Sequence, residues 1–129
     1  MIAAQQSSPP EGAPQKRVVL ILEDEFLTRC TAAMYLREVG YRVVEAANAA
    51  EGMSVLSSGT QVDFVFSDIN MPGSLNGLGF AQWLAKHHPT IRILLTSGMD
   101  RDSGVATGLA FIAKPYHMDE VDRLIKAML

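Results

Sequence analysis

The sequence predicts a doubly wound α/β domain, with a five-stranded parallel sheet in the order 2-1-3-4-5 and helices on both faces. Short apolar runs alternate five times with segments of helical periodicity, and the connections between them are short. The first, third and fourth runs are almost continuously apolar, which is typical of central strands buried on both faces. The second run is more polar, which fits the edge position in this common strand order.

The order of the elements follows from the apolar spacing. Strands are expected over residues 18–22, 41–45, 62–66, 91–95 and 109–113. Helices are expected over residues 25–39, 48–58, 78–87, 100–108 and 118–128. The apolar stripes of the first, third and last helices are Phe26, Cys30, Ala33 and Leu36; Leu78, Ala81, Leu84 and Ala85; and Met118, Val121, Leu124, Ile125 and Met128.

Single residues mark several of the helix ends. Gly40 is expected to end the first helix, and Asn48 with Glu51 is expected to cap the second one. Gly104 and Gly108 weaken the helix expected over residues 100–108. We expect this helix to shift more easily than the others.

Composition limits the domain organisation and the partners. The 129 residues suit one domain, and 48% hydrophobic residues exclude a largely disordered chain. Residues 1–16 hold three prolines and three glutamines, so they are expected to form a disordered tail before a folded domain over residues 17–129. A net charge of −3 argues against a nucleic-acid partner. The absence of a long apolar run or a secretory signal leads us to expect a cytoplasmic protein without a membrane partner.

Candidate reactive side chains follow four of the five expected strands, at the carboxyl end of each. Glu23 and Asp24 follow the first strand, Asp68 the third, Thr96 the fourth and Lys114 the fifth. In the order 2-1-3-4-5, the first, third and fourth strands are neighbours, and ligands of open α/β sheets bind at their carboxyl ends. The sequence therefore predicts one site that contains all of these side chains.

Each of these residues also has a purely structural interpretation. Asp68 suits a turn, Glu23 and Asp24 suit the first turn of a helix, and Thr96 suits a cap. Lys114-Pro115 suits a rigid loop with a cis peptide bond. Any one of them alone would favour the structural interpretation. Together, at the ends of four strands that one fold brings together, they favour a functional site.

The residue types indicate phosphoryl chemistry. Carboxylates about 5 Å apart repel one another by roughly 3 kcal/mol per pair at an effective dielectric of about 20. Lys114 offsets part of this repulsion, and Mg²⁺, which prefers carboxylates, water and phosphoryl oxygens, offsets more. The predicted reaction is attack of an Asp68 oxygen on a phosphoryl group, which gives an acyl phosphate. Lys114 and Mg²⁺ would neutralise the phosphoryl oxygens, and the Thr96 hydroxyl would donate a hydrogen bond to one of them.

Four segments resemble the receiver domains of bacterial two-component response regulators. They are Leu22-Glu23-Asp24-Glu25, Asp68-Ile69-Asn70-Met71-Pro72, Thr96-Ser97-Gly98 and Phe111-Ile112-Ala113-Lys114-Pro115. The resemblance covers residues 17–129. It implies that Asp68 accepts a phosphoryl group from a histidine kinase or a histidine phosphotransfer protein.

The resemblance also implies roles for the surrounding residues. Mg²⁺ would be held by Asp24, Asp68 and the backbone carbonyl of Asn70, with Glu23 acting through water. Thr96 and Phe111 match the switch pair of the family. The chain departs from the family pattern in two places. Glu23 stands where aspartate is commoner, and the loop from Asp68 to Gly77 is one residue longer, with Gly73-Ser74 inserted after Pro72.

Phosphorylation is expected to be read out at a distance from Asp68. Movement of the Thr96 hydroxyl toward Asp68 would free space for Phe111, and a ring with two packed positions is a bistable element. The surface expected to change is formed by the helix over residues 100–108, the strand over 109–113 and the last helix. An unidentified downstream protein would bind this surface. The domain is expected to be a signalling domain and not a substrate-turnover enzyme.

Three other functions share parts of this pattern. A flavodoxin-like cofactor binder has the same strand order, but Glu23-Asp24-Glu25 would repel the phosphate that such proteins bind after the first strand. An aspartyl-phosphate-forming hydrolase would also use Asp68, but it needs a general acid that Asn70 cannot provide. An unphosphorylated scaffold would not need the complete site. The chain is expected to be a stand-alone, single-domain regulator, and the alternative is the excised receiver of a hybrid kinase.

Several residues outside the predicted site are interpreted as structural. Cys30 lies on the apolar stripe of its helix and is expected to be an inert core residue. His87 and His88 end a helix, where they would complement its dipole. Trp83 and Tyr116 are expected to be packing residues.

Overall fold

The computed structural model describes residues 15–98 and 108–129. Its sheet has the strand order β2-β1-β3-β4-β5, and every pairing between neighbours is parallel. The strands are β1 (Val18–Leu22), β2 (Arg42–Ala46), β3 (Phe64–Asp68), β4 (Arg92–Ser97) and β5 (Phe111–Ala113). The helices are α1 (Phe26–Glu38), α2 (Ala49–Ser57), α3 (Gly77–His87) and α5 (Met118–Met128). The predicted fold class and strand order are therefore confirmed.

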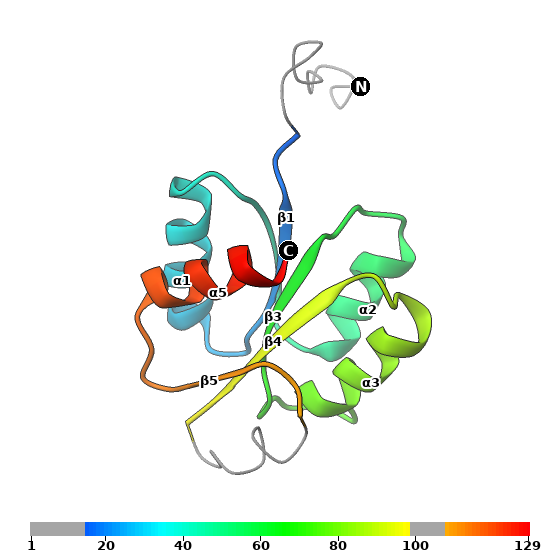
Figure 1. Ribbon diagram of the computed structural model, residues 1–129. Helices are drawn as coiled ribbons and strands as arrows, with labels where there is room; N and C mark the ends of the chain where they lie inside the picture. The colour runs from blue at the N-terminus through cyan, green and yellow to red at the C-terminus, as the bar shows by residue number, and fades with distance from the viewer. Residues whose placement is uncertain (1–14, 99–107) are drawn as a thin grey trace, which may run out of the picture.

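The helix expected over residues 100–108 lies outside the described residues, apart from Gly108. The described helices form two layers: α1 and α5 cover one face of the sheet, and α2 and α3 cover the other (Figure 1). None of them is long and apolar enough to cross a membrane.

Alternate side chains of the central strands enter two separate hydrophobic cores. Val19 and Ile21 of β1 point into the core under α1 and α5, whereas Leu20 and Leu22 point into the core under α2 and α3. β3 divides in the same way, with Phe66 on the first face and Val65 on the second. Because both faces of these strands are covered, neither face needs polar residues, which explains their continuous apolar sequences.

The caps of α1 and α2 form as the sequence predicts. The Asn48 side chain accepts a hydrogen bond from the Glu51 amide at 2.8 Å, and Glu51 Oε1 accepts one from the Ala47 amide at 2.8 Å. This reciprocal pair is a capping box in which the acidic side chain reaches one residue further back. Gly40 follows α1 with a φ of 113°, a value that favours glycine.

The predicted stripe of α1 is wrong at its first residue. Phe26 is 61% exposed, and Cys30 is only partly buried, whereas Ala32, Ala33 and Leu36 are buried. Phe26 is the first residue of the helix, at the carboxyl edge of the sheet. Its ring lies 5.5 Å from the Arg29 guanidinium, which it contacts in place of the core.

The predicted face of α3 is displaced by one residue. Ala85 is exposed, and the buried residues are Gly77, Phe80, Ala81 and Leu84. The spacing between these four still fits one helical stripe, but Phe80 and not Ala85 belongs to it. Trp83 packs against Phe80 and stacks on His87, which confirms the packing role expected of Trp83.

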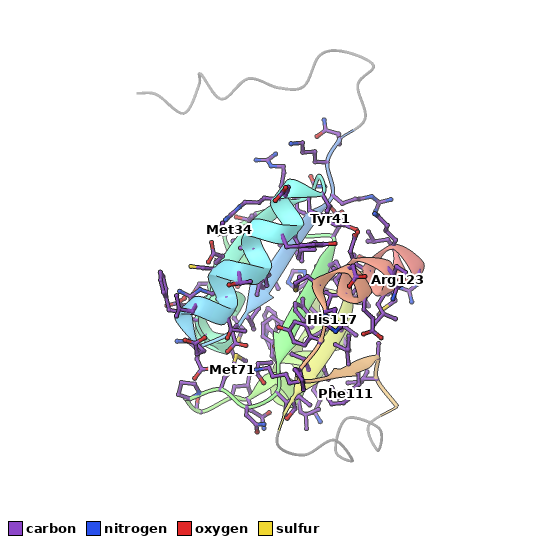
Figure 2. The ribbon with its side chains drawn as sticks, turned by 90° about the vertical axis from the view of Figure 1, so that its left-hand side faces the viewer. Met34, Tyr41, Met71, Phe111, His117 and Arg123 are labelled. Carbon is purple, nitrogen blue, oxygen red and sulfur yellow. The ribbon has the colours of Figure 1, made fainter. Side chains whose placement is uncertain are left out.

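β2, β3 and β4 begin one or two residues later than expected, and β5 is shorter than expected. β2 begins at Arg42, because Tyr41 leaves the strand and is buried between α1 and α5 (Figure 2). β5 contains only Phe111–Ala113, and Leu109 is exposed. The expected stripe of α5 is correct, since Val121 and Ile125 are buried and the other three predicted members pack against them.

Tyr41 ties the start of β2 to α5. Its hydroxyl donates a hydrogen bond of 2.9 Å to Asp122 Oδ1, and Asp122 Oδ2 accepts one from Lys126. Burial, then the hydrogen bond and charge of Asp122, raise the pKa of Tyr41 well above its usual value near 10. In the folded protein this phenol therefore stays protonated at a pH where it ionises in the unfolded chain.

We expect Tyr41→Phe to destabilise the domain by about 2 kcal/mol at neutral pH, because a buried hydrogen bond to a charged group is lost. The wild type should also lose stability above about pH 10, where the unfolded chain binds fewer protons than the folded one. Tyr41→Phe lacks this contribution, so the difference between the two proteins should shrink as the pH rises. Urea unfolding at pH 7 and pH 11 measures both effects, and a constant difference would contradict the assignment.

Candidate functional site

The carboxyl edge of the sheet brings the predicted side chains together. Asp68 is the last residue of β3, and in the sheet it pairs with Thr96 of β4. Glu23 follows β1, and Lys114 directly follows β5 and precedes Pro115 across a cis peptide bond. Glu23 and Asp68 are only 4% and 5% exposed, so each carboxylate needs polar partners from the protein.

Lys114 joins the two buried carboxylates. Its Nζ lies 2.7 Å from Asp68 Oδ2 and 3.2 Å from Glu23 Oε1. The remaining oxygen of each carboxylate accepts a backbone hydrogen bond: Asp68 Oδ1 from the Asn70 amide at 3.1 Å, and Glu23 Oε2 from the Glu25 amide at 3.0 Å. Both carboxylates are thus oriented by fixed donors before any ligand arrives.

Asp24 completes an acidic cluster at this edge. Oxygen atoms of Glu23, Asp24 and Asp68 all lie within 4.8 Å of one another, and Asp24 is exposed to solvent. One lysine cannot neutralise three carboxylates at this spacing. A donor set made only of carboxylate oxygens, open to water on the Asp24 side, fits a hard divalent cation such as Mg²⁺.

The electrostatic environment shifts two of these groups. Burial is the main reason why the pKa of Glu23 is raised; the charge of Asp68 adds to it, while the Glu25 amide and Lys114 oppose it. Burial alone would lower the pKa of Lys114, but its hydrogen bond to Asp68 and the charges of Asp68 and Glu23 outweigh burial and raise it. Lys114 is therefore held in its ammonium form beside Asp68.

Thr96 is buried and its hydroxyl lacks a hydrogen-bond partner among the described residues. It borders a small cavity between Asp68, Phe66 and Tyr116, in which there is no room for a water molecule. Asn70 lies on the solvent side, where its Nδ2 donates to Ser97 Oγ at 2.9 Å. Phe111, the other expected switch residue, pairs with Leu95 in the sheet and is partly buried.

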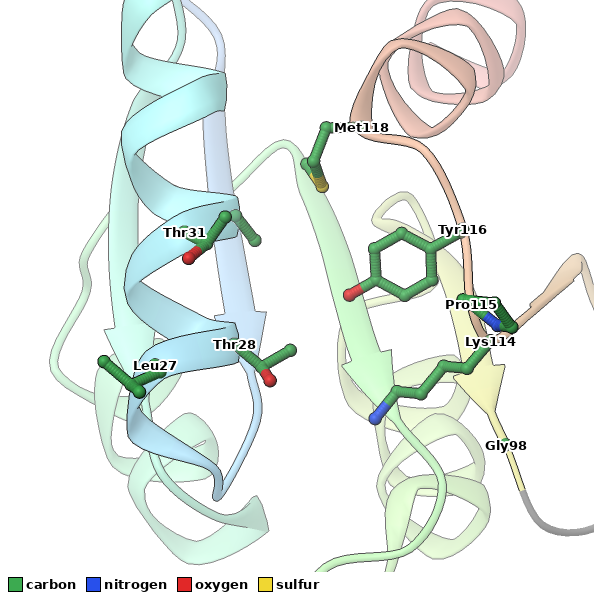
Figure 3. A pocket seen from close by; sticks show the side chains of 9 residues that line it. Leu27, Thr28, Thr31, Gly98, Lys114, Pro115, Tyr116 and Met118 are labelled. Atoms are coloured by element: carbon green, nitrogen blue, oxygen red, sulfur yellow. The ribbon is translucent and has the colours of Figure 1, made fainter.

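A larger pocket opens beside Lys114. It has a volume of about 640 Å³ and lies between the start of α1, with Leu27 and Thr31, and the segment that follows β5 (Figure 3). Tyr116 and Met118 close its inner side, and Tyr116 packs edge-on against Phe66 at 5.5 Å between ring centroids. Burial raises the pKa of Tyr116 to about 12. The expected packing role of Tyr116 is confirmed.

Sequence reasoning missed the role of Gly77 in shaping the site. Gly77, the first residue of α3, lies against the backbone of Asp68, and its amide donates to the Ile69 carbonyl at 2.9 Å. A Cβ atom at this position would clash with the Asp68 carbonyl and lie 2.8 Å from Ile69 Cα. Only glycine permits this approach. The signal in the sequence was a glycine directly after the Asn76 cap.

Comparison with known proteins identifies the same family as the four segments noted in the sequence. A family model described as the response regulator receiver domain matches residues 19–126. Sensor kinase CckA of Brucella abortus (strain 2308) is 32% identical over 117 residues, which cover 86% of this chain and 12% of that protein. Aerobic respiration control protein ArcA of Escherichia coli (strain K12) is 33% identical over 108 residues, which cover 80% of this chain and 44% of that protein. The chain therefore spans less than half the length of these curated relatives.

A solved structure of a response regulator has the same fold. Response regulator protein TrrA of Thermotoga maritima, crystallised in complex with Mg²⁺ and BeF, superposes with a TM-score of 0.77. Its sequence is 28% identical, and the match covers 88% of this chain and 99% of that one. Receiver domains are signalling domains of two-component systems that accept phosphoryl groups from histidine kinases. On the family match, which spans most of the chain, this protein belongs to the response regulator receiver domain family.

Proposed function

We propose that Asp68 is the phosphoacceptor of this receiver domain and that its donor is a histidine kinase or a histidine phosphotransfer protein. The observation that carries the proposal is the 2.7 Å contact of Lys114 Nζ with Asp68 Oδ2 beside the carboxylates of Glu23 and Asp24. One Asp68 oxygen attacks the phosphorus atom of a phosphohistidine. The phosphorus–nitrogen bond breaks, the imidazole leaves with the bonding electron pair, and an acyl phosphate forms.

The acidic cluster would hold Mg²⁺ through Asp24, Asp68 and the backbone carbonyl of Asn70, with Glu23 acting through a water molecule. The bound ion supplies positive charge to the phosphoryl oxygens. Glu23 is held by Lys114 and by the Glu25 amide, which supports an indirect role for it. The complex of TrrA with Mg²⁺ and BeF supports the same cofactor here.

The remaining residues would turn phosphorylation into a conformational change. Lys114 exchanges its contact with Asp68 for one with the phosphoryl group, and the Thr96 hydroxyl gains the partner that it lacks among the described residues. Movement of Thr96 frees space for the Phe111 ring, which changes the surface of β5 and α5. An unidentified downstream protein reads this surface. A phosphoryl group can shift the equilibrium only by its different interactions with the two states, about 1–3 kcal/mol.

The competing function is an aspartyl-phosphate-forming hydrolase. Such an enzyme would need a general acid close to Asp68, and residue 70 is an asparagine whose side-chain amide is engaged by Ser97. A signalling role, without turnover of a small substrate, is therefore the function that we propose. The limits of the domain, residues 17–129 after a tail over 1–16, remain a prediction.

Intact-mass spectrometry with acetyl phosphate tests the proposal. The wild type should gain one phosphoryl group when Mg²⁺ is present and none in excess chelator. Asp68→Asn should gain none, because an amide is not a nucleophile for this reaction; the asparagine still fits the space. Asp24→Asn is the second variant and should lower the rate without removing the acceptor. Phosphorylation of Asp68→Asn at the wild-type level would overturn the assignment.

A further inference from the structure

Arg29 of α1 reaches the loop that carries the acidic cluster. Its side chain is only 16% exposed, which is unusual for an arginine in a surface helix. Its Nη1 donates a hydrogen bond of 2.9 Å to the backbone carbonyl of Glu23. Its Nε donates to Glu45 Oε1 at 3.3 Å. The guanidinium therefore bridges the loop after β1 and the edge strand β2.

A second arginine holds the same glutamate. Arg37 Nη1 lies 3.2 Å from Glu45 Oε2, and Arg37 Nη2 donates to the Val43 carbonyl at 3.0 Å. Glu45 is thus fixed between two guanidiniums from one helix. Arg37 has no recorded contact with the acidic loop among the described residues, whereas Arg29 contacts it directly. The two arginines share a charge and the Glu45 partner, but of the two only Arg29 contacts the acidic loop.

The peptide that Arg29 contacts is the one that joins Glu23 to Asp24. Its carbonyl is fixed by Arg29, and the Glu23 amide, one peptide earlier, donates to the Ala46 carbonyl at 3.1 Å. Because a peptide group is planar, fixing the Glu23 carbonyl also fixes the amide and the Cα atom of Asp24, from which its side chain extends. Asp24 is the exposed member of the acidic cluster, so this backbone anchor limits the positions that its carboxylate can take.

We propose that Arg29 is a positioning residue that fixes the peptide between Glu23 and Asp24 and thereby directs the Asp24 carboxylate at the cation site. The proposal rests on the proposed function, since the ion is Mg²⁺ held by Asp24 and Asp68. Arg29 does not touch the ion; it acts through the backbone of the loop. Partners that orient metal ligands in this way commonly change metal affinity by about 10–100-fold when they are removed.

The sign of the effect separates positioning from simple electrostatics. Removing a positive charge close to an acidic cluster should by itself strengthen the binding of a cation. A role confined to stability should change the unfolding midpoint and leave the affinity of the folded protein unchanged. The positioning role predicts the opposite of the electrostatic effect, namely weaker binding of Mg²⁺. Arg37→Ala removes the same charge and the same partner, and is the matched control.

The test is calorimetric titration of the unphosphorylated protein with MgCl₂, at a temperature where each variant is folded by circular dichroism. Arg29→Ala should bind Mg²⁺ about 10-fold more weakly than the wild type. Arg37→Ala should bind as tightly as the wild type or slightly more tightly. Arg29→Lys keeps the charge but cannot form both hydrogen bonds, so it should also bind more weakly. It serves as the second variant if Arg29→Ala is poorly folded.

A readout without metal supports the titration. The amide resonance of Asp24, recorded in chelator, should shift in Arg29→Ala and stay in place in Arg37→Ala, because only Arg29 contacts that peptide. Wild-type affinity in both Arg29 variants would overturn the positioning role and leave the proposed function intact. A wild type that fails to bind Mg²⁺ would overturn both.

Discussion

Gly77→Ala is expected to destabilise the domain by about 3 kcal/mol and to slow phosphorylation of Asp68 in the protein that remains folded. The new Cβ would meet the backbone carbonyl of Asp68 and lie 2.8 Å from Ile69 Cα. These are main-chain atoms at the end of a central strand, and the Ile69 amide is hydrogen-bonded to the Thr96 carbonyl at 2.9 Å. Neither atom can move without displacing Asp68, so the clash is relieved at the site itself.

Gly79→Ala, in the same helix, is the control for Gly77→Ala. Its Cβ would also meet a neighbour, but that neighbour is the side chain of Leu75, which can rotate away. Alanine has a helix propensity about 1 kcal/mol better than glycine, so Gly79→Ala should be neutral or stabilising. Urea unfolding and the rate of acetyl phosphate labelling measure both variants. Equal unfolding midpoints for the two would show that the β3–α3 loop tolerates a side chain against Asp68.

Lys114→Ala is expected to keep or strengthen Mg²⁺ binding while it abolishes the conformational response to phosphorylation. The ammonium neutralises part of the acidic cluster, so its removal leaves the carboxylates of Glu23 and Asp68 more attractive to a cation. The same ammonium, on the residue directly after β5, is the group that we expect to follow the phosphoryl oxygens. Without it, the modified Asp68 loses its direct link to that strand.

Two measurements separate these effects. Calorimetric titration gives the Mg²⁺ affinity of Lys114→Ala, and a clear fall would contradict the role of Lys114. Amide chemical shifts with and without beryllofluoride give the response. In the wild type, changes should extend over residues 108–118 and into α5; in Lys114→Ala they should stay near Glu23 and Asp68. Changes confined to those loops in the wild type as well would reject the proposed switch through Phe111.

The pH dependence of the stability of Lys114→Ala follows from the raised pKa of Glu23. The pKa of Glu23 is raised in the folded state, so as the pH rises above about 4.5 Glu23 loses its proton in the unfolded chain before it does so in the folded protein. Over that pH range Glu23 lowers the free energy of unfolding. Lys114 opposes this shift. Without Mg²⁺, Lys114→Ala should therefore lose more stability than the wild type between acidic and neutral pH.

The sequence was sufficient to predict the features that depend on period and position. The apolar runs of β1, β3 and β4 predicted central strands because both of their faces are covered. The candidate residues of the site were found because each lies at or just after the carboxyl end of a strand, and parallel strands place their carboxyl ends at one edge. As a result, Lys114 contacts both Asp68 and Glu23.

Features that depend on where an element ends in space were not predictable in this way. Phe26 has the right spacing for the buried stripe of α1, but it lies past the edge of the sheet, so there is no strand beneath it. On α3, both Phe80 and Ala85 fit an apolar spacing with Ala81 and Leu84, but Phe80 is buried and Ala85 is exposed. Arg29 was not identified because a single arginine in a helix carries no signal of a buried contact with a backbone carbonyl.

The buried Thr96 hydroxyl has a consequence for the sensitivity of the protein to its signal. An unsatisfied polar group in the interior raises the free energy of the state that contains it by about 1–3 kcal/mol. The Thr96 hydroxyl has no hydrogen-bond partner among the described residues, so the described conformation carries this cost. In the proposed switch, a conformation that gives the hydroxyl a partner would be relieved of it, and each gain of about 1.4 kcal/mol would make a small active fraction about tenfold larger. The proposed response to a weak stimulus would then depend partly on a hydrogen bond that Thr96 does not make with the described residues.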